Sequence, residues 1–107
     1  MATTNTQARV VWSVDVEEFA AKHHVTDVLA KLVEATHDIV NSAQEFKVYI
    51  EDDPEIADDR HIMIHAEVDG WSVDQLMEAQ DRWTSALFEL CSTTAAWVFR
   101  LRLLPRD

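Results

Sequence analysis

The segment Arg60–Val68, RHIMIHAEV, decides the fold because its side chains alternate in character over its whole length. Every second side chain is apolar: Ile62, Ile64, Ala66 and Val68. The side chains between them are His61, Met63, His65 and Glu67. A period of two with β-branched residues is typical of a strand that buries one face. The segment therefore predicts a strand whose inner face is wholly apolar.

A second alternating segment, EFKVYIE, lies at Glu45–Glu51 and places Phe46, Val48 and Ile50 on one side. Two alternating strands joined by a polar loop predict a β-hairpin. The run between them is acidic, with carboxylates at Glu51, Asp52, Asp53, Glu55, Asp58 and Asp59. A calcium loop of the EF-hand type needs a glycine at its sixth position, and this run contains none. We interpret it as a solvated loop or as a partner-binding loop for a basic protein.

Helices are predicted on both sides of this hairpin. Apolar side chains recur at helical spacing over 22–41, at Val25, Val28, Leu29, Leu32, Val33, Thr36, Ile39 and Val40. Phe19 lies off that stripe, so a turn or a short, differently oriented helical piece should precede this helix. Ser72 and Gln75 have the spacing of a capping box, which predicts a second helix that begins there and ends near Cys91.

The two ends of the chain predict the outer strands. RVVWSV at 9–14 alternates and carries apolar residues on both faces, which favours a central strand. AWVFRLRLL at 96–104 alternates as well and should end at Pro105. Three tryptophans fall on inner faces and are predicted to be core, and a fourth should pack as a staple before the second helix: Trp12, Trp83, Trp97 and Trp71.

The predicted order is strand, helix, strand, strand, helix, strand. This order is typical of a ferredoxin-like βαββαβ sandwich, an α+β fold in which two helices cover one face of an antiparallel sheet. The first and third strands would then be central and the other face open. The length of 107 residues suits a single domain, 1–107, with residues 1–7 as a disordered tail. Without the strand at 9–14, the fold would be a three-stranded α+β layer.

The alternation also predicts what lies on the open sheet face. Its candidate binding residues are Lys47, Tyr49, His61, Met63, His65, Arg100 and Arg102. On a strand, His61 and His65 are separated by roughly 13 Å, too far to share one metal ion. The sequence holds no phosphate loop, no nucleophile elbow and no metal-ligand spacing. We therefore predict no catalytic residues, no metal and no cofactor.

The net charge of the chain favours some classes of binding partner over others. With 20 acidic and 9 basic residues, the chain has a formal net charge of −11. Nucleic-acid binders gain affinity by setting Lys and Arg against phosphates, so this composition argues against nucleic acid. The open face also has only one aromatic residue, Tyr49, where RNA-recognition domains stack bases on several. An acidic surface suits a basic protein partner or simply maintains solubility.

The location is predicted from what the sequence does not contain. Cys91 is the single cysteine, so no internal disulfide can form. The first residues, MATTNTQARVVW, have no apolar core of a signal peptide, and no apolar run approaches the roughly 20 residues of a membrane helix. We expect a cytoplasmic protein that does not enter membranes.

The run FKVYIEDDPEIADDRHIMIHAEV, followed by a capped helix containing DRW, resembles a loose pattern in small uncharacterised bacterial α+β proteins. Some of those proteins lie beside toxin–antitoxin or defence genes. The resemblance covers roughly residues 25 to 90. It implies a bacterial origin and a role through protein contacts, and it brings no site residues.

Three functions stay open on the sequence alone. The first is a non-enzymatic protein-interaction module, such as an inhibitor, an immunity or antitoxin-like protein or an adaptor, that binds a basic protein through the acidic loop and the helices. The second is a ligand-sensing or self-associating domain, such as a homodimer, that uses the open sheet face. The third is a small enzyme, for which the sequence offers no motif.

Overall fold

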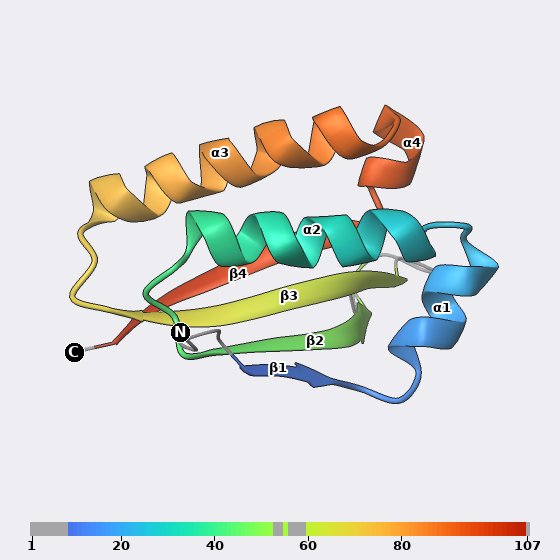
Figure 1. The fold of residues 1–107 in the computed structure, drawn as a ribbon, viewed down its shortest axis with the longest axis horizontal. Coiled ribbons are helices and arrows are strands. Elements are labelled where there is room, and N and C mark those ends of the chain that lie inside the picture. The colour runs from blue at the N-terminus through green and yellow to red at the C-terminus, as the bar shows by residue number, and fades with distance from the viewer. Residues whose placement is uncertain (1–8, 53–54, 56–59, 107) are drawn as a thin grey trace, which may run out of the picture.

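The computed structural model describes residues 9–52, 55 and 60–106 as one sheet with helices on one side. The elements in chain order are β1 (Arg9–Trp12), α1 (Val16–Lys22), α2 (Thr26–Ile39), β2 (Glu45–Asp52), β3 (Arg60–Asp69), α3 (Val73–Leu90), α4 (Thr93–Ala96) and β4 (Phe99–Arg106). Figure 1 shows α2 and α3 above the same face of the sheet, with α1 and α4 near one end of them. The α+β layering predicted from the sequence is present, and in the part of the chain that the structure describes the opposite face carries no helix.

The ferredoxin-like prediction is wrong in the order and direction of the strands. The sheet order is β1-β2-β3-β4, so β2 and β3 are central rather than the first and third strands. β1 pairs with β2 in parallel, β2 with β3 antiparallel, and β3 with β4 in parallel, which makes the sheet mixed. The same order of elements fits both arrangements because a helical connection can return the chain to an adjacent strand or to one further away.

The prediction of a central first strand failed because β1 is short and poorly covered. Its residues are mostly exposed, and the side chains of Val11 and Trp12 are 39% and 44% exposed. A central strand has a hydrogen-bonded neighbour on each side, whereas β1 pairs only with β2 among the described residues. Apolar residues on both faces of this segment therefore mark an exposed edge of the sheet and not its middle.

The last strand begins later than predicted because a short helix precedes it. The hydroxyl of Ser92 accepts a hydrogen bond from the Ala95 amide at 3.3 Å and caps α4. Trp97 therefore lies at the end of this helix with 69% of its surface exposed, and the prediction that it is a core residue is wrong. β4 also continues through Pro105, which an edge strand tolerates because one side of its backbone needs no partner.

The capping box that predicted the second long helix is present. The Gln75 amide donates to the Ser72 hydroxyl at 3.2 Å, and the Ser72 amide donates to the Gln75 side chain at 2.8 Å. Gly70, with φ of 70°, makes the turn between β3 and this cap. The predicted staple residue Trp71 packs partly buried against the core. No side-chain cap stands at Asp15. α2 lies within the predicted 22–41 helix, and α1 is the short helical piece that was expected before it.

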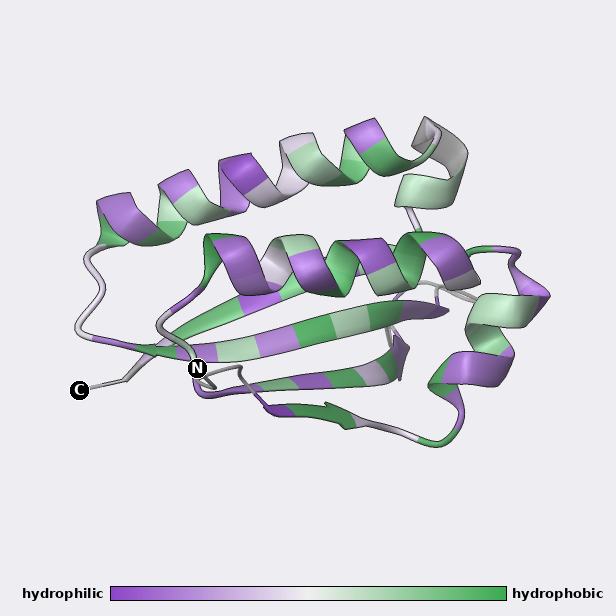
Figure 2. Ribbon diagram, viewed as in Figure 1, coloured by the Kyte–Doolittle hydropathy of each residue, from purple (hydrophilic) through white to green (hydrophobic). Residues whose placement is uncertain are grey.

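The core lies between the inner face of the sheet and the helices. Its fully buried side chains include Val16, Leu32, Thr36, Val40, Phe46, Val48, Ile62, Ile64 and Val68. Figure 2 shows hydrophilic and hydrophobic residues alternating along β2 and β3, as their sequences predict. At about 25 cal/mol per Å² of apolar surface, this burial is the main term that holds the helices on the sheet.

One buried polar contact joins the two long helices. The indole Nε1 of Trp83 on α3 donates to the Thr36 Oγ1 of α2 at 2.8 Å, and that hydroxyl donates to the Leu32 carbonyl at 2.6 Å. Thr36 is 0% and Trp83 4% exposed, so no water replaces these bonds. The Trp83 indole N–H and the Thr36 hydroxyl are therefore both hydrogen-bonded although they are buried in an apolar core.

The short helix α1 ends in a Schellman motif with an unusual residue at its left-handed position. The Val25 amide donates to the Ala20 carbonyl at 2.9 Å and the His24 amide donates to the Ala21 carbonyl at 3.1 Å. Val25 and Ala20 are both buried, which supplies the apolar contact of this motif. His24 has φ of 58°, a conformation in which glycine avoids the Cβ clash.

Replacing His24 with glycine is expected to raise the free energy of unfolding by about 0.5 to 1 kcal/mol, because the left-handed strain is removed from an exposed side chain. Denaturant unfolding measures the change. The matched control is His23→Gly, at the neighbouring exposed position with φ of −95°, which should be destabilising. Stabilisation by both variants would contradict the conformational explanation.

Candidate functional site

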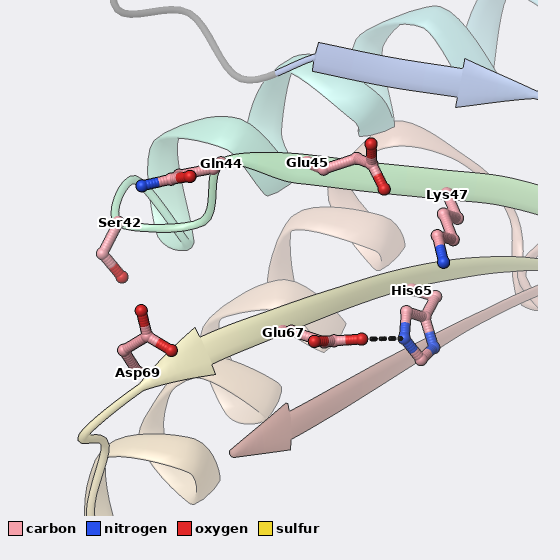
Figure 3. Close-up of a pocket in the computed structure, with 7 residues that line it drawn as sticks. All are labelled: Ser42, Gln44, Glu45, Lys47, His65, Glu67 and Asp69. Carbon is pink, nitrogen blue, oxygen red and sulfur yellow. Dashed lines mark ion pairs between the residues drawn. The ribbon is translucent and has the colours of Figure 1, made fainter. Parts of the chain in front are cut away.

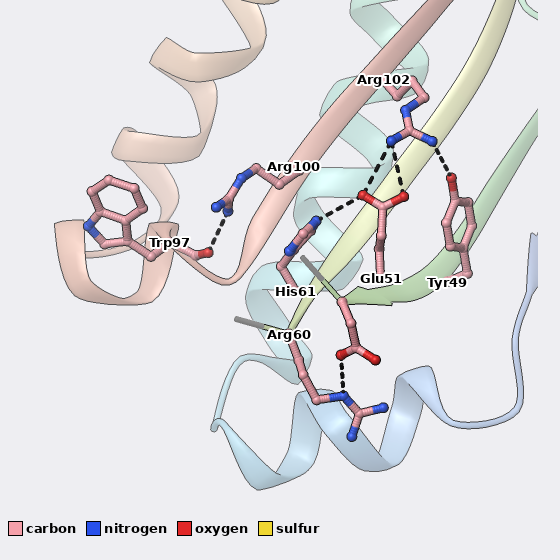
Figure 4. Close-up of polar contacts among 8 residues, drawn as sticks. Tyr49, Glu51, Arg60, His61, Trp97, Arg100 and Arg102 are labelled. Carbon is pink, nitrogen blue, oxygen red and sulfur yellow. Dashed lines mark hydrogen bonds and ion pairs between the residues drawn. The ribbon is translucent and has the colours of Figure 1, made fainter. Parts of the chain in front are cut away.

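The open sheet face carries a polar cluster centred on Glu51 of β2 (Figure 4). Arg102 of β4 donates two hydrogen bonds to the Glu51 carboxylate, at 3.0 and 3.2 Å, and a third to the Tyr49 hydroxyl at 3.2 Å. The His61 Nε2 lies 3.3 Å from the Oε1 of the same carboxylate, an oxygen that also accepts a hydrogen bond from Arg102. These side chains come from β2, β3 and β4, so the cluster links the two hairpin strands, β2 and β3, to the edge strand β4.

This cluster partly closes the face that the sequence predicts to be open. Because β3 lies between β2 and β4, the Arg102 side chain must pass over β3 to reach Glu51. Met63 and His61 on the outer face of β3 are accordingly only 5% exposed. The Nδ1 atoms of His61 and His65 have no hydrogen-bond partner among the described residues. The middle of the face is therefore a packed polar layer with its main cation already paired.

We expect Glu51→Gln to lower the free energy of unfolding by about 1 to 2 kcal/mol, because a charge-assisted, two-point contact under partial cover is lost. The expected loss is this small because the side chains of Glu51 and Arg102 are 31% and 41% exposed, so solvent screens their attraction. Urea unfolding of Glu51→Gln, Arg102→Met and the double variant measures their coupling.

The control for this prediction is the neighbouring pair Arg60–Asp52. Its atoms are also close, at 2.8 Å, but its side chains are 56% and 66% exposed. Asp52→Asn should therefore change stability by less than about 0.5 kcal/mol. Equal costs for Glu51→Gln and Asp52→Asn would show that the cluster adds nothing beyond an ordinary surface ion pair.

At the far end of the same face, a polar hollow of about 240 Å³ lies between β2 and β3 (Figure 3). Its lining is Ser42, Gln44, Glu45, Lys47, His65, Glu67 and Asp69. The His65 Nε2 lies 3.7 Å from a Glu67 carboxylate oxygen. Three carboxylates face one lysine and one histidine here, so the hollow does not favour an anion.

Arg100 is another of the residues predicted to lie on the open sheet face. It donates to the Trp97 carbonyl at 2.8 Å, and its guanidinium lies 5.9 Å from the centre of the Trp97 ring. The structure thus brings all the predicted residues onto one face, but Arg100 and Arg102 are held by protein groups.

The predicted acidic loop is divided by the structure. Glu51 belongs to β2 and points to the open face, where it binds Arg102 and His61. Asp52 ends β2 and pairs with Arg60. Glu55 is exposed. The remaining predicted loop residues, Asp53, Asp58 and Asp59, lie outside the described residues.

A second candidate site was not predicted from the sequence. It is an apolar groove of about 600 Å³ between the edge strand β1 and the helices, which we call the β1–α2 groove. Its lining is Trp12, Ser13, Val14, Glu17, Ala20, Thr26, Leu29, Ala30 and Val33. Trp12 shares the inner face of the sheet with Val48, its partner in register, but the helices leave it 44% exposed. Val14, which follows the strand, is 98% exposed.

Acidic side chains are frequent on the segments that form this groove. Glu17 lines it, and Asp15 and Glu18 are exposed beside it in the chain. On α2, Asp27 and Glu34 lie three residues before and four after the lining residue Ala30, which places them on the same side of the helix. Lys31 also lies near, so carboxylates outnumber cations here. The sequence signal for this groove is the pair of apolar residues Trp12 and Val14, which are exposed in the structure.

The remaining chemistry of the described residues is sparse. Among them, no group of three or more His, Cys, Asp and Glu side chains could hold a metal ion. Desolvation by burial raises the pKa of the Cys91 thiol, and its Sγ lies 3.4 Å from the Leu87 carbonyl. Cys91 therefore has less thiolate at neutral pH than an ordinary cysteine. In the described part of the chain, no helix is long and apolar enough to cross a membrane.

Comparison of the chain with protein-family models, curated proteins and solved structures finds no match to any of the three.

Proposed function

We propose that the protein is a non-enzymatic interaction module that binds a basic segment of another protein in the β1–α2 groove. The observation that carries this proposal is the apolar groove with carboxylates around it, on a chain of net charge −11. Buried apolar contacts supply affinity, and the acidic surroundings select cationic partners and speed their approach. An inhibitor or an immunity or antitoxin-like protein is one concrete form of this role.

The groove supports binding better than the open sheet face does. On the open face, the guanidinium of Arg102 is already neutralised by Glu51, and His61 and Met63 on the outer face of β3 are buried. In the groove, Trp12 and Val14 are exposed, and none of the other described residues covers them. Exposed apolar surface with a polar rim is typical of a protein-binding site.

The test uses synthetic peptides of lysine and valine, because no natural partner is needed to probe charge and apolarity together. Binding is measured by fluorescence anisotropy at low salt and at about 0.3 M salt. We expect salt to weaken the affinity without abolishing it, since the apolar contacts remain. Peptides of lysine and serine with the same charge should bind more weakly at both salt concentrations.

The matched variants place one positive charge inside and one outside the groove. Val14→Lys is expected to weaken the lysine–valine peptide about three- to tenfold, and Val73→Lys on α3 to change it less than twofold. Both positions are exposed, at 98% and 68%, so neither variant should unfold the protein. No binding of any peptide, or equal weakening by both variants, would refute the groove as the site.

A further inference from the structure

The backbone of β1 has hydrogen-bonding groups directed away from the sheet. The Arg9 amide donates to the Gln44 carbonyl and the Ser13 amide to the Val48 carbonyl, each at 3.0 Å. Successive backbone groups of a strand point to opposite sides. The N–H and C=O groups of Val10 and Trp12 therefore point away from β2, at the edge of the sheet that the described residues form.

The opposite edge of the sheet is obstructed. On β4, the Leu101 carbonyl accepts a hydrogen bond from the Gln80 side chain of α3 at 3.0 Å. Pro105 in the same strand has no N–H to offer. These are devices by which proteins prevent strands from adding to an edge. β1 shows neither of them, so the two edges differ in their capacity to pair.

The β1–α2 groove lies where an added strand would direct its side chains. A new strand would run about 4.8 Å from β1 and continue the inner face of the sheet beyond Trp12. Every second side chain of that strand would then enter the groove beside Trp12, Leu29 and Val33. Asp15, Glu17 and Glu18 follow β1 in the chain, so carboxylates are concentrated beyond its C-terminal end.

We propose that the partner segment binds by strand addition to β1, as an extended chain that alternates apolar and polar residues and carries lysine or arginine. Its apolar side chains fill the β1–α2 groove, and its basic side chains meet the carboxylates beyond Ser13. Main-chain hydrogen bonds to Val10 and Trp12 add affinity, and the groove adds specificity. This inference rests on the proposed function and names the conformation of its partner.

The first test compares two peptides of identical lysine and valine composition with the unmodified protein. One alternates the two residues, which favours a strand, and the other spaces valine for one face of a helix. We expect the alternating peptide to bind at least about tenfold more tightly. Failure of both peptides sinks the proposed function itself, whereas preference for the helical peptide overturns only strand addition.

The second test removes peptide N–H groups by N-methylation at every second position. An added strand directs one alternate set of N–H groups to β1 and the other set to solvent. We expect one methylated series to lose about tenfold or more in affinity and the other to bind nearly as before. Equal loss in both series would indicate a helical ligand, and no loss in either would indicate attraction by charge alone. Either result overturns the inference.

The third test locates the contact by amide hydrogen exchange. Binding of the alternating peptide should slow exchange at Val10 and Trp12 much more than at Ser13, whose amide is already bonded to Val48. Binding without protection at Val10 and Trp12 overturns the inference. So does a free protein that sediments as a dimer with these two amides already protected, because a second copy would then occupy the edge.

Discussion

Trp83→Ala is expected to lower the free energy of unfolding by about 3 to 5 kcal/mol. The side chain is 4% exposed, packs within the core and bridges α3 to α2 through Thr36. Alanine would remove the largest apolar surface at this contact and leave a cavity between the helices. Urea unfolding followed by circular dichroism measures the loss, and the control Trp97→Ala, at a 69% exposed tryptophan, should cost far less.

The hydrogen bond can be separated from the packing by a double-mutant cycle. Thr36→Val leaves the Trp83 N–H buried without an acceptor, which we expect to cost about 1 to 3 kcal/mol. Trp83→Phe removes that donor, so adding Thr36→Val to it should cost less than Thr36→Val alone. Additive costs would contradict a bond between the two side chains. Similar costs for Trp83→Ala and Trp97→Ala would contradict the burial of Trp83.

The second large effect is expected on both faces of β3. Ile64→Ala should lower the free energy of unfolding by about 3 to 4 kcal/mol, because Ile64 is fully buried under the helices. Met63→Ala, one residue earlier and on the opposite face, should cost about 2 kcal/mol. Its cost is smaller because polar side chains, and not helices, cover it. The exposed Met77→Ala, at 61% exposure, is the control and should change stability by less than about 0.5 kcal/mol.

This comparison tests whether the helix-free face is packed by its own side chains. If Arg102 covers β3, then Arg102→Ala should expose Met63 and reduce the additional cost of Met63→Ala. If Met63→Ala were as harmless as Met77→Ala, the outer face of β3 would be open to solvent in solution. That result would favour the open sheet face as a binding surface.

Much of the local structure could be predicted because local pattern determines it. Alternation at Glu45–Asp52 and Arg60–Asp69 predicts both strands and their buried faces, and the observed register pairs Val48 with Ile64 on the inner side. The Ser72–Gln75 capping box predicts the start of α3 to the residue. In each case the decisive contacts lie within a few positions or on facing strands of one hairpin.

The order of the strands could not be predicted because it depends on contacts between distant segments. The same elements can place the first strand in the middle or at the edge, and the pairing of β1 with β2 alone and the exposure of Val11 and Trp12 show the edge position. Trp97 was predicted as core because alternation alone does not reveal a capped helical turn at Ser92.

The candidate sites could not be predicted for the same reason, because both depend on the strand order. The Glu51–Arg102 contact requires β4 beside β3, and the β1–α2 groove requires β1 at the edge. The alternation did place Lys47, His61 and Arg102 on one face. The neutralisation of Arg102 by Glu51 is a consequence of the strand order, as is the exposure of Trp12.

The strand order also divides the chain into two structurally similar halves. The parallel pair β1–β2 forms within residues 9–52, with Arg9 opposite Glu45, and β3–β4 forms within 60–106, with Ile62 opposite Phe99. The hairpin ladder and the Thr36–Trp83 bond join one half to the other. Two molecules whose connection between β2 and β3 opened could therefore exchange halves and rebuild every contact in an intertwined pair. The variants that weaken the bridge between α2 and α3 are the ones in which such domain swapping would first be seen.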